Sequence, residues 1–537
     1  MKDILMFLQA CCCSGAGIMA CRPLFHWFQL ESYQFPGYFR TLKRQGFRSL
    51  EAGTLMTLVS VSLTAFDWKL FFQLPEWLRA FICGAGLLCA GYGLHTRSKR
   101  QKAKKKLVYT PRMKRLNAVY FVVWSLTLFV VFHLLKDCGI LGRGLTLAVF
   151  YLLLPLTAAF AGLLAWPIEK GISELYFRDA QRILRNHPDL IKIGITGSWG
   201  KTSVKFILGT LLSEKYPTLV TPASFNTPMG VTKVIRTQLE PGHRIFVAEM
   251  GARHVGDIRE MCRLVNPKIG ILTSVGPQHL DTFHTQERIT RTKYELIDAI
   301  PTDGSCFFAD DDGIVLRLWE KTKKPKTLAG MNAGRDDVWA ENLSMTPLGS
   351  RFDLCTPGEK VPCETKMLGE LNIKNIILCA SVCLKLGMTG KEISRGIRNL
   401  MPVEHRLELR QNPGGIHVLD DAFNSNIRGA EQAFKVLKEF PGKRIVVTPG
   451  MVELGEREAE MNREFGRIMA ECCDEAILIG KKRSVAIREG LEEAGLDPSH
   501  IQVANNLEEA AEILREIAHN GDSVLFENDL PDNYTEE

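Results

Sequence analysis

One segment near the middle of the chain has the residue types and spacing of a phosphate-binding loop. It reads Gly-Ile-Thr-Gly-Ser-Trp-Gly-Lys-Thr-Ser over residues 194–203, between an apolar β-rich run and a helical one. Glycines let backbone N–H groups close on a phosphate, and the start of a helix adds a favourable dipole. We expect nucleotide phosphates to be held by Gly197, Ser198, Gly200, Lys201, Thr202 and Ser203.

Two side chains of this loop have separate expected roles. The Lys201 ammonium would reach the β- and γ-phosphates, and the Thr202 hydroxyl would ligate Mg²⁺. The strict Walker spacing places a glycine at position 195, where this chain has Ile195. A glycine-rich turn without function is the alternative, and the position between strand and helix argues against it.

Three further polar residues follow in places where a metal–nucleotide site would need them. Glu249 ends an apolar run in V-A-E-M-G, His279 follows the next run in S-V-G-P-Q-H-L, and Lys293 lies on the next helix in R-T-K-Y-E-L. Parallel α/β sheets bind ligands at the carboxyl edge of their strands. Each residue alone has a structural interpretation, but together after a phosphate loop they indicate metal binding. Because an ammonium cannot ligate Mg²⁺, an ordinary exposed lysine is the alternative at position 293.

The elements that must position these residues alternate between short β-rich runs and helical runs from residue 191 onward. Such alternation is typical of parallel α/β sheets. A helix-rich stretch over 372–400 and Pro402 separate two blocks. We therefore expect a phosphate-loop α/β domain over 191–400 and a Rossmann-like α/β domain over 403–537. The expected strands are 191–196, 244–249, 269–274, 305–309, 415–420, 444–448, 475–479 and 523–527.

The first third of the chain has a different composition, which predicts transmembrane helices. Residues 1–170 carry 21 Lys and Arg against 7 Asp and Glu, whereas the rest carries 46 against 53. A spanning helix needs about 20 apolar residues, because lipid cannot satisfy exposed backbone groups. We expect about five spans within 1–168 and a linker helix over 169–190. The apolar segments are 4–21, 52–66, 78–95, 118–135 and 144–166.

The charges between these segments predict their orientation. The run 97–115 carries ten basic residues and no acidic one, and the 22–50 loop carries five basic residues. Basic loops stay on the cytoplasmic side, so we expect the chain after residue 167 to lie in the cytoplasm. Between two spans, the run 97–115 is expected to contact anionic lipid and not nucleic acid. A cleaved signal peptide is the less favoured alternative for 4–21, since Lys2 alone makes a poor basic region.

The cysteines give no sign of a disulfide framework. There are 15 of them, and none forms a C-x-x-C pair. Cys379/Cys383 and Cys472/Cys473 lie in helix-like stretches without partnering histidines, which disfavours the alternative of a zinc site. We expect reduced, packed thiols in a cytosolic domain.

Several motifs in order along the chain resemble those of the Mur ligase family, most closely its D-alanyl-D-alanine-adding, MurF-type branch. The resemblance covers roughly residues 190–530. The motifs are T-G-S-W-G-K-T-S, A-E-M-G, V-G-P-Q-H-L-D, T-K-Y-E-L, L-G-E-L-N-I-K-N (368–375), E-H-R (404–406), L-D-D-A-F-N-S-N (419–426) and G-M-V-E-L-G-E (450–456).

The resemblance implies an ATP-dependent acid–amino-acid ligase. Mur ligases phosphorylate a substrate carboxylate with ATP, and the amine of an amino acid or dipeptide attacks the acyl phosphate. By the match, Lys201 holds the phosphates with the loop amides. One Mg²⁺ would be bound by Thr202 and Glu249, and a second by His279. The lysine matching Lys293 is carbamylated in several members, which turns a repelled cation into a Mg²⁺ ligand.

The family pattern also assigns roles outside the phosphate loop. Lys201, Glu249, His279 and Lys293 would be the catalytic residues. Asn375 would lie near the adenine, Arg406 would contact phosphate, and Asp421 would meet the ribose from the last domain. Closure of that domain would assemble the site and exclude water from the labile acyl phosphate.

The chain departs from the family pattern at its front. Soluble members carry an N-terminal domain that holds a UDP-sugar, whereas here only about twenty residues separate the last apolar segment from the first strand. We therefore expect a transmembrane region in place of that domain, with membrane lipid as a partner and a lipid-linked or other envelope precursor as the carboxylate acceptor. Within the motifs, Trp199 replaces an asparagine, Leu371 a histidine and Ile427 a proline, and Phe423 stands where tyrosine or lysine is usual.

Three functions follow from these observations. The preferred one is a membrane-anchored, MurF-like amide ligase of cell-wall or envelope synthesis. A poly-γ-glutamate synthase-like ligase is the second, since that class also joins membrane helices to a Mur-type ATPase. The third is a catalytically idle scaffold of an envelope-synthesis complex.

Overall fold

The chain forms two compact units, Met1–Glu174 and Leu175–Glu537. The computed structural model describes residues 2–70, 74–100, 106–223, 225–278, 280–311, 313–411, 414–423, 427–452, 454 and 457–529.

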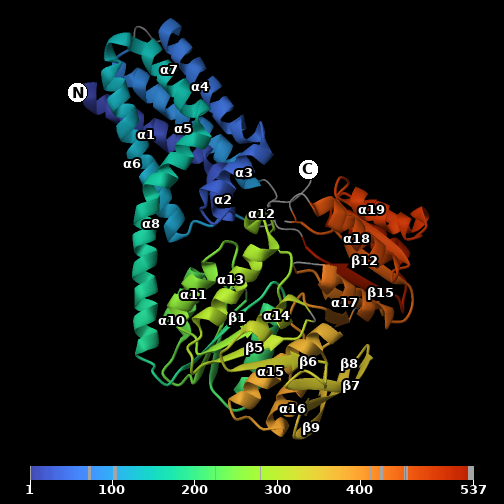
Figure 1. The fold of residues 1–537 in the computed structure, drawn as a ribbon. Helices are drawn as coiled ribbons and strands as arrows, with labels where there is room; N and C mark the ends of the chain where they lie inside the picture. The colour runs from blue at the N-terminus through green and yellow to red at the C-terminus, as the bar shows by residue number, and fades with distance from the viewer. Residues whose placement is uncertain are drawn as a thin grey trace. The chain divides into compact units, whose positions relative to one another are not determined.

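The N-terminal unit is built from helices (Figure 1). Proline stands in the first turn of three of the helices before residue 135, where its missing N–H costs no hydrogen bond. Thr110 caps the longest of these three, because its Oγ1 accepts from Met113 N at 3.2 Å. The helices are α1 (Lys2–Ala20), α2 (Arg22–Leu30), α3 (Phe35–Gln45), α4 (Arg48–Leu70), α5 (Glu76–Arg100), α6 (Pro111–Leu134), the 3-10 turn η1 (Lys136–Cys138), α7 (Gly139–Leu152) and α8 (Leu154–Arg185), which continues into the second unit.

Three helices in the described part of this unit are long and apolar enough to cross a membrane. They are α1, the Trp77–Lys99 part of α5, and α6. A fourth candidate is a bent pair, Gly142–Leu152 with Leu154–Arg185, which turns by 75° at its break. By length and composition the described residues therefore offer three spans, or four with the bent pair, where about five were expected from the sequence.

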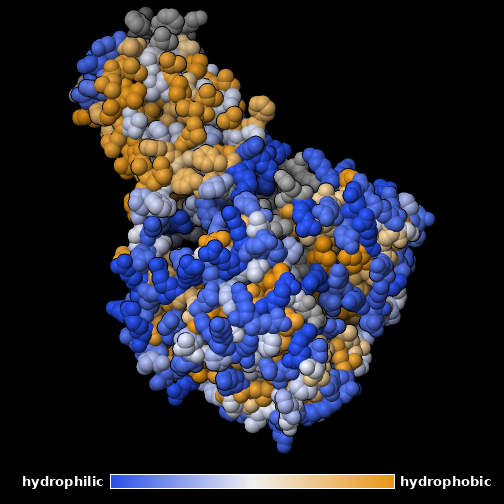
Figure 2. Space-filling view, viewed as in Figure 1, coloured by the Kyte–Doolittle hydropathy of each residue, from blue (hydrophilic) through white to orange (hydrophobic). Residues whose placement is uncertain are grey.

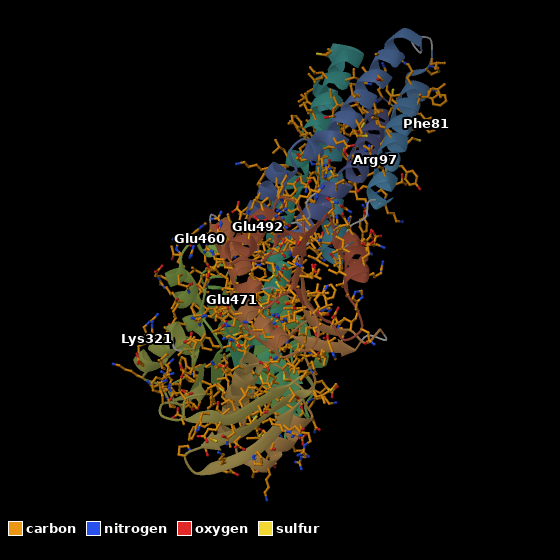
Figure 3. The ribbon with its side chains drawn as sticks, turned by 90° about the vertical axis from the view of Figure 1, so that its right-hand side faces the viewer. Phe81, Arg97, Lys321, Glu460, Glu471 and Glu492 are labelled. Carbon is orange, nitrogen blue, oxygen red and sulfur yellow. The ribbon has the colours of Figure 1, made fainter. Side chains whose placement is uncertain are left out.

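On the face seen in Figure 2, the N-terminal unit is largely apolar and the second unit largely polar. On α6, Val122, Leu126 and Val130 follow one another at helical spacing and are 54%, 52% and 51% exposed. Phe81 of α5 points away from the helices around it (Figure 3). Hydroxyl groups are instead buried between the helices, as where Tyr151 Oη donates to Cys13 O at 3.0 Å. Apolar side chains outside and hydrogen-bonded hydroxyls such as that of Tyr151 inside are typical of a protein surrounded by lipid.

A nine-stranded sheet forms the core of the second unit, in the order β2-β3-β1-β4-β5-β6-β7-β8-β9. Pairing is parallel from β2 to β7 and antiparallel from β7 to β9. The central strands are buried on both faces, which explains why their sequences are continuous apolar runs. The strands are β1 (Ile191–Thr196), β2 (Thr218–Val220), β3 (Ile245–Glu249), β4 (Ile269–Leu272), β5 (Ser305–Ala309), β6 (Lys326–Gly330), β7 (Val338–Thr346), β8 (Gly349–Thr356) and β9 (Glu359–Thr365).

Helices cover both faces of this sheet. One face packs against α9, α15 and α16, and the other against α10, α11, α13, α14 and the end of α8 (Figure 1). The helices are α9 (Lys201–Ser213), α10 (Pro228–Gln238), α11 (Asp257–Val265), α12 (Leu280–Phe283), α13 (Gln286–Ala299), α14 (Ile314–Lys321), α15 (Glu370–Lys385) and α16 (Gly390–Arg398).

A second, six-stranded sheet follows in the chain, in the order β10-β11-β15-β12-β13-β14. Only the β10–β11 pair is antiparallel. Helices α17, α18 and α19 pack on one face and α20 on the other. The elements are β10 (Glu408–Gln411), β11 (His417–Asp421), α17 (Ile427–Lys438), β12 (Arg444–Thr448), α18 (Glu458–Ala470), β13 (Glu475–Ile479), α19 (Ser484–Glu493), the 3-10 turn η3 (Pro498–His500), β14 (Ile501–Ala504), α20 (Leu507–Ile517) and β15 (Ser523–Glu527).

The expected fold class is confirmed. Helices apolar enough for membrane spans come first in the chain. Two largely parallel sheets, each with helices on both faces, follow. Each of the eight strands expected from the sequence is present, within three residues at either end.

Candidate nucleotide and metal site

The glycine-rich loop connects β1, a central strand of the first sheet, to the start of α9. Its backbone is fixed by the end of the neighbouring strand β4, since Ser198 N donates to Ser274 O at 2.9 Å. Gly197 lies so close to this strand end that a Cβ would collide with the Thr273 hydroxyl. Gly200 has a φ of +79°, a left-handed conformation that favours glycine. The loop therefore has the backbone shape that its sequence predicts.

Lys201 opens α9 and its side chain folds back over the loop. Its Nζ donates to Gly197 O at 2.7 Å and to Ser198 O at 2.9 Å. Burial lowers the pKa of Lys201 to about 8, because the ammonium loses solvation; Glu249 opposes this shift and Arg406 adds to it. The ammonium therefore lies over the loop whose amides are expected to hold phosphate.

Glu249 is the centre of the site. It ends β3, is 1% exposed, and accepts hydrogen bonds at both carboxylate oxygens. Its Oε1 accepts from Thr202 Oγ1 and from Asn226 Nδ2, each at 3.1 Å, and its Oε2 accepts from Lys205 Nζ at 3.0 Å. The structure thus brings the expected pair Thr202 and Glu249 into direct contact.

These donors fit Mg²⁺ better than a transition metal. Mg²⁺ is usually held by one or two carboxylates together with substrate phosphates, and its preferred ligands are oxygens. Glu249 and the Thr202 hydroxyl supply such oxygens next to the phosphate loop. Among the described residues, no group of three or more His, Cys, Asp or Glu side chains comes together as a metal site. Cys379, Cys383, Cys472 and Cys473 are buried thiols.

Lys293 lies on α13 and is 2% exposed, so the interpretation as an exposed helix lysine is wrong. Burial holds the pKa of Lys293 well below its usual value, and repulsion from Lys201 lowers it further. The carboxylates of Asp257 and Glu249 act in the opposite direction. Lys293 is therefore a buried amine within the electrostatic reach of both Lys201 and Glu249. His279 lies outside the described residues.

Two other expected nucleotide-binding residues lie on helices that pack against the first sheet. Ser203 is 6% exposed on α9, two residues after Lys201. Asn375 is 5% exposed on α15, and its Oδ1 would be 3.2 Å from a Cβ placed on Gly200. The Asn375 amide is therefore beside the last glycine of the loop.

Asp421 is the last residue of β11 in the second sheet, and Arg406 lies two residues before β10. The Arg406 guanidinium stacks over Phe423 at 4.4 Å and donates to Phe423 O at 2.9 Å. Burial lowers the pKa of Arg406, while Asp421 and Glu249 raise it. Burial raises the pKa of Asp421 to about 6, against the opposing effects of Arg406 and the Leu407 N–H, which donates to Asp421 Oδ1 at 3.1 Å. Arg406 is therefore electrostatically coupled to Glu249 of the first sheet.

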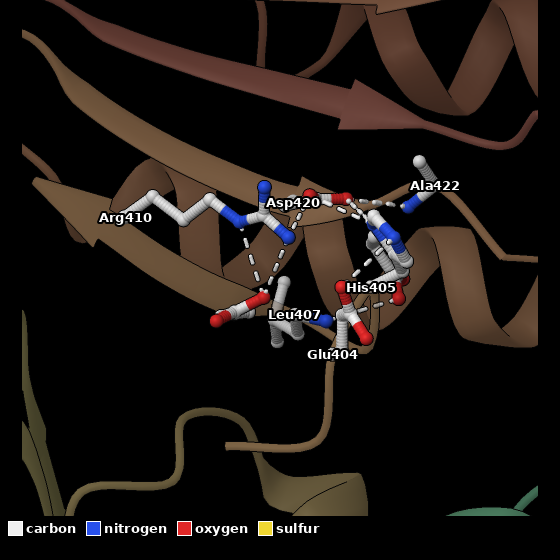
Figure 4. A network of polar contacts seen from close by, with 8 residues as sticks. Glu404, His405, Leu407, Arg410, Asp420 and Ala422 are labelled. Atoms are coloured by element: carbon white, nitrogen blue, oxygen red, sulfur yellow. Dashed lines mark hydrogen bonds and ion pairs between the residues drawn. The ribbon is translucent and has the colours of Figure 1, made fainter. Parts of the chain in front are cut away.

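A polar network fixes the segment that carries Arg406 (Figure 4). His405 Nδ1 lies 2.9 Å from Asp420 Oδ2, and Arg410 Nη2 lies 3.0 Å from the same oxygen. Asp420 Oδ1 also accepts from Ala422 N at 3.2 Å. His405 and Leu407 have φ values of +57° and +51°, so the two residues flanking Arg406 hold an unfavourable left-handed backbone.

Two residues of the site were not expected from the sequence. Lys205 follows Lys201 by four positions on a helix and so lies on the same face, which is a local signal for a second buried cation. Asn226 lies in the loop between β2 and α10, and only its spatial contact with Glu249 reveals its role.

Comparisons with known proteins agree with this geometry. A model described as "Mur ligase middle domain" matches residues 195–383, and one described as "Mur ligase, glutamate ligase domain" matches residues 405–527. Each match covers one of the two sheets with its helices.

Curated relatives carry the name UDP-N-acetylmuramoyl-tripeptide--D-alanyl-D-alanine ligase. The Escherichia coli strain K12 protein is 30% identical over 293 residues, which are 54% of this chain and 64% of that protein, less than two thirds of its length. The Mycobacterium tuberculosis strain CDC 1551 protein is 30% identical over 356 residues, which are 62% of this chain and 69% of that protein.

A solved structure shares the fold of the second unit. It is the MurF ligase from Thermotoga maritima in complex with ADP, with a TM-score of 0.60 and 24% identity. The likeness covers 68% of this chain and 81% of that structure.

Proposed function

This chain belongs to the Mur ligase family, and we propose that it is an ATP-dependent amide ligase of the MurF type that acts on a cell-wall or envelope precursor. One observation carries the proposal. The phosphate loop with Lys201, the Thr202–Glu249 pair and the guanidinium of Arg406 are electrostatically coupled at the carboxyl edge of β1 and β3. That edge is where open α/β sheets bind ligands.

In the proposed reaction, phosphoryl transfer to the acceptor is followed by attack of the amine. An oxygen of the acceptor carboxylate attacks the γ-phosphorus of ATP, the bond to the β-γ bridging oxygen breaks, and ADP leaves. The amine nitrogen then attacks the acyl phosphate carbon, the C–O bond to phosphate breaks, and the nitrogen gives up a proton as the amide forms. Negative charge builds on the transferred phosphoryl group, and Lys201 and Arg406 are the cations placed to offset it. One such contact contributes about 3 kcal/mol, or about a hundredfold in rate.

Mg²⁺ would be held by the oxygens of Thr202 and Glu249. When bound, it supplies Lewis-acid neutralisation of the phosphate oxygens. Phosphoryl transfer sites commonly hold two such ions, and we propose His279 and Lys293 for the second.

We further propose that Lys293 is carbamylated in the active protein. Burial lowers the pKa of Lys293 well below its usual value and so favours the neutral amine, which is the form that adds CO₂ to give a carbamate and a proton. The carbamate would bring anionic oxygens to a position where the ammonium is repelled by Lys201. Its presence is testable by the mass of a peptide containing Lys293 after chemical trapping of the carbamate.

The amide donor would be an amino acid or dipeptide, and the carboxylate acceptor a lipid-linked or other envelope precursor at the inner face of a bacterial membrane. The apolar surface of residues 1–174 and the candidate spans within them support this location. The names of the relatives specify a UDP-N-acetylmuramoyl-tripeptide acceptor and D-alanyl-D-alanine for those proteins, so both belong among the substrates to be tried.

The test combines a cellular and a purified assay. We expect cells that carry Lys201→Ala to accumulate one carboxylate precursor and to lose its amide product, as read by mass spectrometry of lipid-linked and soluble precursors. Purified full-length protein should release ADP only when the matching acceptor and amine are both present. Lys268→Ala is the control, since Lys268 is 57% exposed and pairs with the exposed Asp303. An unchanged precursor profile in Lys201→Ala would contradict the ligase and favour the scaffold.

A further inference from the structure

Lys205 is a fully buried lysine that lies one helical turn after the phosphate-loop lysine. Its side chain is 0% exposed, and its Nζ donates to Glu249 Oε2 at 3.0 Å and to Ala223 O. Lysine is almost never fully buried unless its charge is paired, because an unpaired buried ammonium costs several kcal/mol of lost hydration. The reaction as described above makes no use of this ammonium.

The contacts of Lys205 divide the two oxygens of Glu249 between different partners. Oε2 accepts from the Lys205 ammonium, whereas Oε1 accepts from the Thr202 hydroxyl and the Asn226 amide. A carboxylate held in this way cannot rotate to exchange its oxygens without breaking a buried ion pair. Oε2 is therefore held by the ammonium, and Oε1 is the oxygen beside the Thr202 hydroxyl, where a metal ion would take the place of one of its two hydrogen bonds.

The same ammonium holds a strained loop. Ala223 has a φ of +43°, a left-handed conformation that is costly for an L-residue. Its carbonyl accepts from Lys205 Nζ, and three residues later Asn226 donates to Glu249 Oε1. Gly251 N donates to Asn226 O at 2.8 Å, so the loop is also tied to the chain just after β3. Lys205 thus joins α9 to the end of β3 and to Ala223.

We propose that Lys205 is a positioning residue that orients the Glu249 carboxylate, together with Ala223 and Asn226, so that Oε1 faces the Mg²⁺ position beside Thr202. This inference rests on the proposed function, because it assumes that Mg²⁺ and a nucleotide bind at Glu249. Lys205 acts through Glu249 and does not itself touch the reacting atoms.

Two possible roles of Lys205, a contribution of charge alone or the positioning of Glu249, predict opposite effects of its removal on Mg²⁺ affinity. If Lys205 contributed only its charge, its removal would relieve repulsion between two cations and tighten Mg²⁺ binding. If Lys205 fixes the carboxylate, its removal lets Glu249 turn and weakens Mg²⁺ binding, because Mg²⁺ demands near-ideal octahedral geometry. Losing the orienting partner of a metal ligand typically costs about 10- to 100-fold in metal affinity.

The experiment measures binding by the full-length protein in detergent micelles. A fluorescent, non-hydrolysable ATP analogue is titrated without metal, then with Mg²⁺ and with Mn²⁺, in wild type, Lys205→Met and Lys268→Met. We expect Lys205→Met to keep the metal-free affinity and to lose about tenfold in Mg²⁺ affinity, with a smaller loss for Mn²⁺. Lys268 is the matched control, since it forms an ion pair at the same 3.0 Å but is 57% exposed.

Lys205→Arg covers the case in which Lys205→Met does not fold, because the guanidinium keeps the charge paired. Its planar fork cannot reproduce the contacts of a compact ammonium, so the Mg²⁺ affinity should still fall relative to that for Mn²⁺. Unchanged or tighter Mg²⁺ binding in every variant that folds would overturn the positioning role. If the wild type itself does not bind the analogue with Mg²⁺, the proposed function fails instead, and the two failures are distinguishable.

Discussion

Asp421 and Glu527 lie opposite each other at the end of the paired segment of β11 and β15. Two carboxylates therefore meet at the carboxyl edge of the second sheet, close to the segment that carries Arg406. Burial raises the pKa of Asp421 to about 6, and Arg406 only partly offsets that shift. The burial of Asp421 therefore links the stability of the second sheet to pH.

Replacement of Asp421 by asparagine should stabilise the protein above pH 6. An unfolded aspartate titrates near pH 3.9, so between about pH 4 and pH 6 the folded state binds more protons than the unfolded one. Stability from this group is present below that window and lost as pH rises through it. In Asp421→Asn the loss disappears, while the amide oxygen can still accept from Leu407 N. Thermal unfolding of both proteins from pH 4 to pH 8 measures the difference; parallel curves would contradict it.

Nucleotide binding should weaken above pH 8 because Lys201 loses its proton there. The pKa of Lys201 is lowered to about 8 by burial, so the ammonium that offsets phosphate charge is present below this pH. We expect the affinity for metal-free ATP to fall by up to about tenfold per pH unit above pH 8. Lys201→Arg keeps its charge at all these pH values, so its affinity, even if lower, should show no such slope. A slope shared by both proteins would assign the titration to another group.

Gly197→Ala should weaken nucleotide binding. A Cβ at this position collides with the Thr273 hydroxyl and lies 2.9 Å from Ser274 N, so the loop must leave the end of β4. We expect a loss of at least about tenfold in ATP affinity, since the backbone amides that bind phosphate move with the loop. Gly242→Ala is the control, because nothing lies within 4 Å of a Cβ there. Equal affinity in the two variants would exclude the loop as the phosphate site.

Leu126→Arg should impair membrane insertion. Leu126 is 52% exposed on α6, and an arginine at the centre of a spanning helix costs about 2.5–3.5 kcal/mol on insertion. We expect less protein in the carbonate-washed membrane fraction of cells. Leu348→Arg is the control, since Leu348 is 83% exposed at the turn between β7 and β8. If both variants fractionate like the wild type, the apolar surface of α6 does not face lipid.

The sequence predicts the parallel strands well and the antiparallel ones poorly, for a physical reason. Strands such as β1 and β3 are buried on both faces and appear as continuous apolar runs. In β7 and β9 buried and exposed residues alternate, and most exposed ones are polar, so no apolar run marks them. β2 has three residues, too few for any pattern to be recognised.

The sequence predicts those residues of the site that share one motif or end a recognisable strand. It does not predict residues that only the fold brings to the site. Lys201 and Thr202 are adjacent in one motif, and Glu249 ends a strand that neighbours the loop. Asn226 reaches Glu249 from a loop whose course no local pattern determines. The burial of Lys205 and Lys293 follows from the packing of α9 and α13 on opposite faces of the sheet, which composition alone does not reveal.

The left-handed backbone at Leu407 affects which substitutions this position can accept. Leucine adopts this conformation at a cost of about 1–2 kcal/mol, which the surrounding contacts offset. A glycine there would remove this cost, but it would also delete the buried Leu407 side chain from the core of the second sheet, a loss of about 2–5 kcal/mol. The packing of this side chain therefore outweighs the strain, and a leucine at position 407 keeps the backbone beside Arg406 in a single conformation.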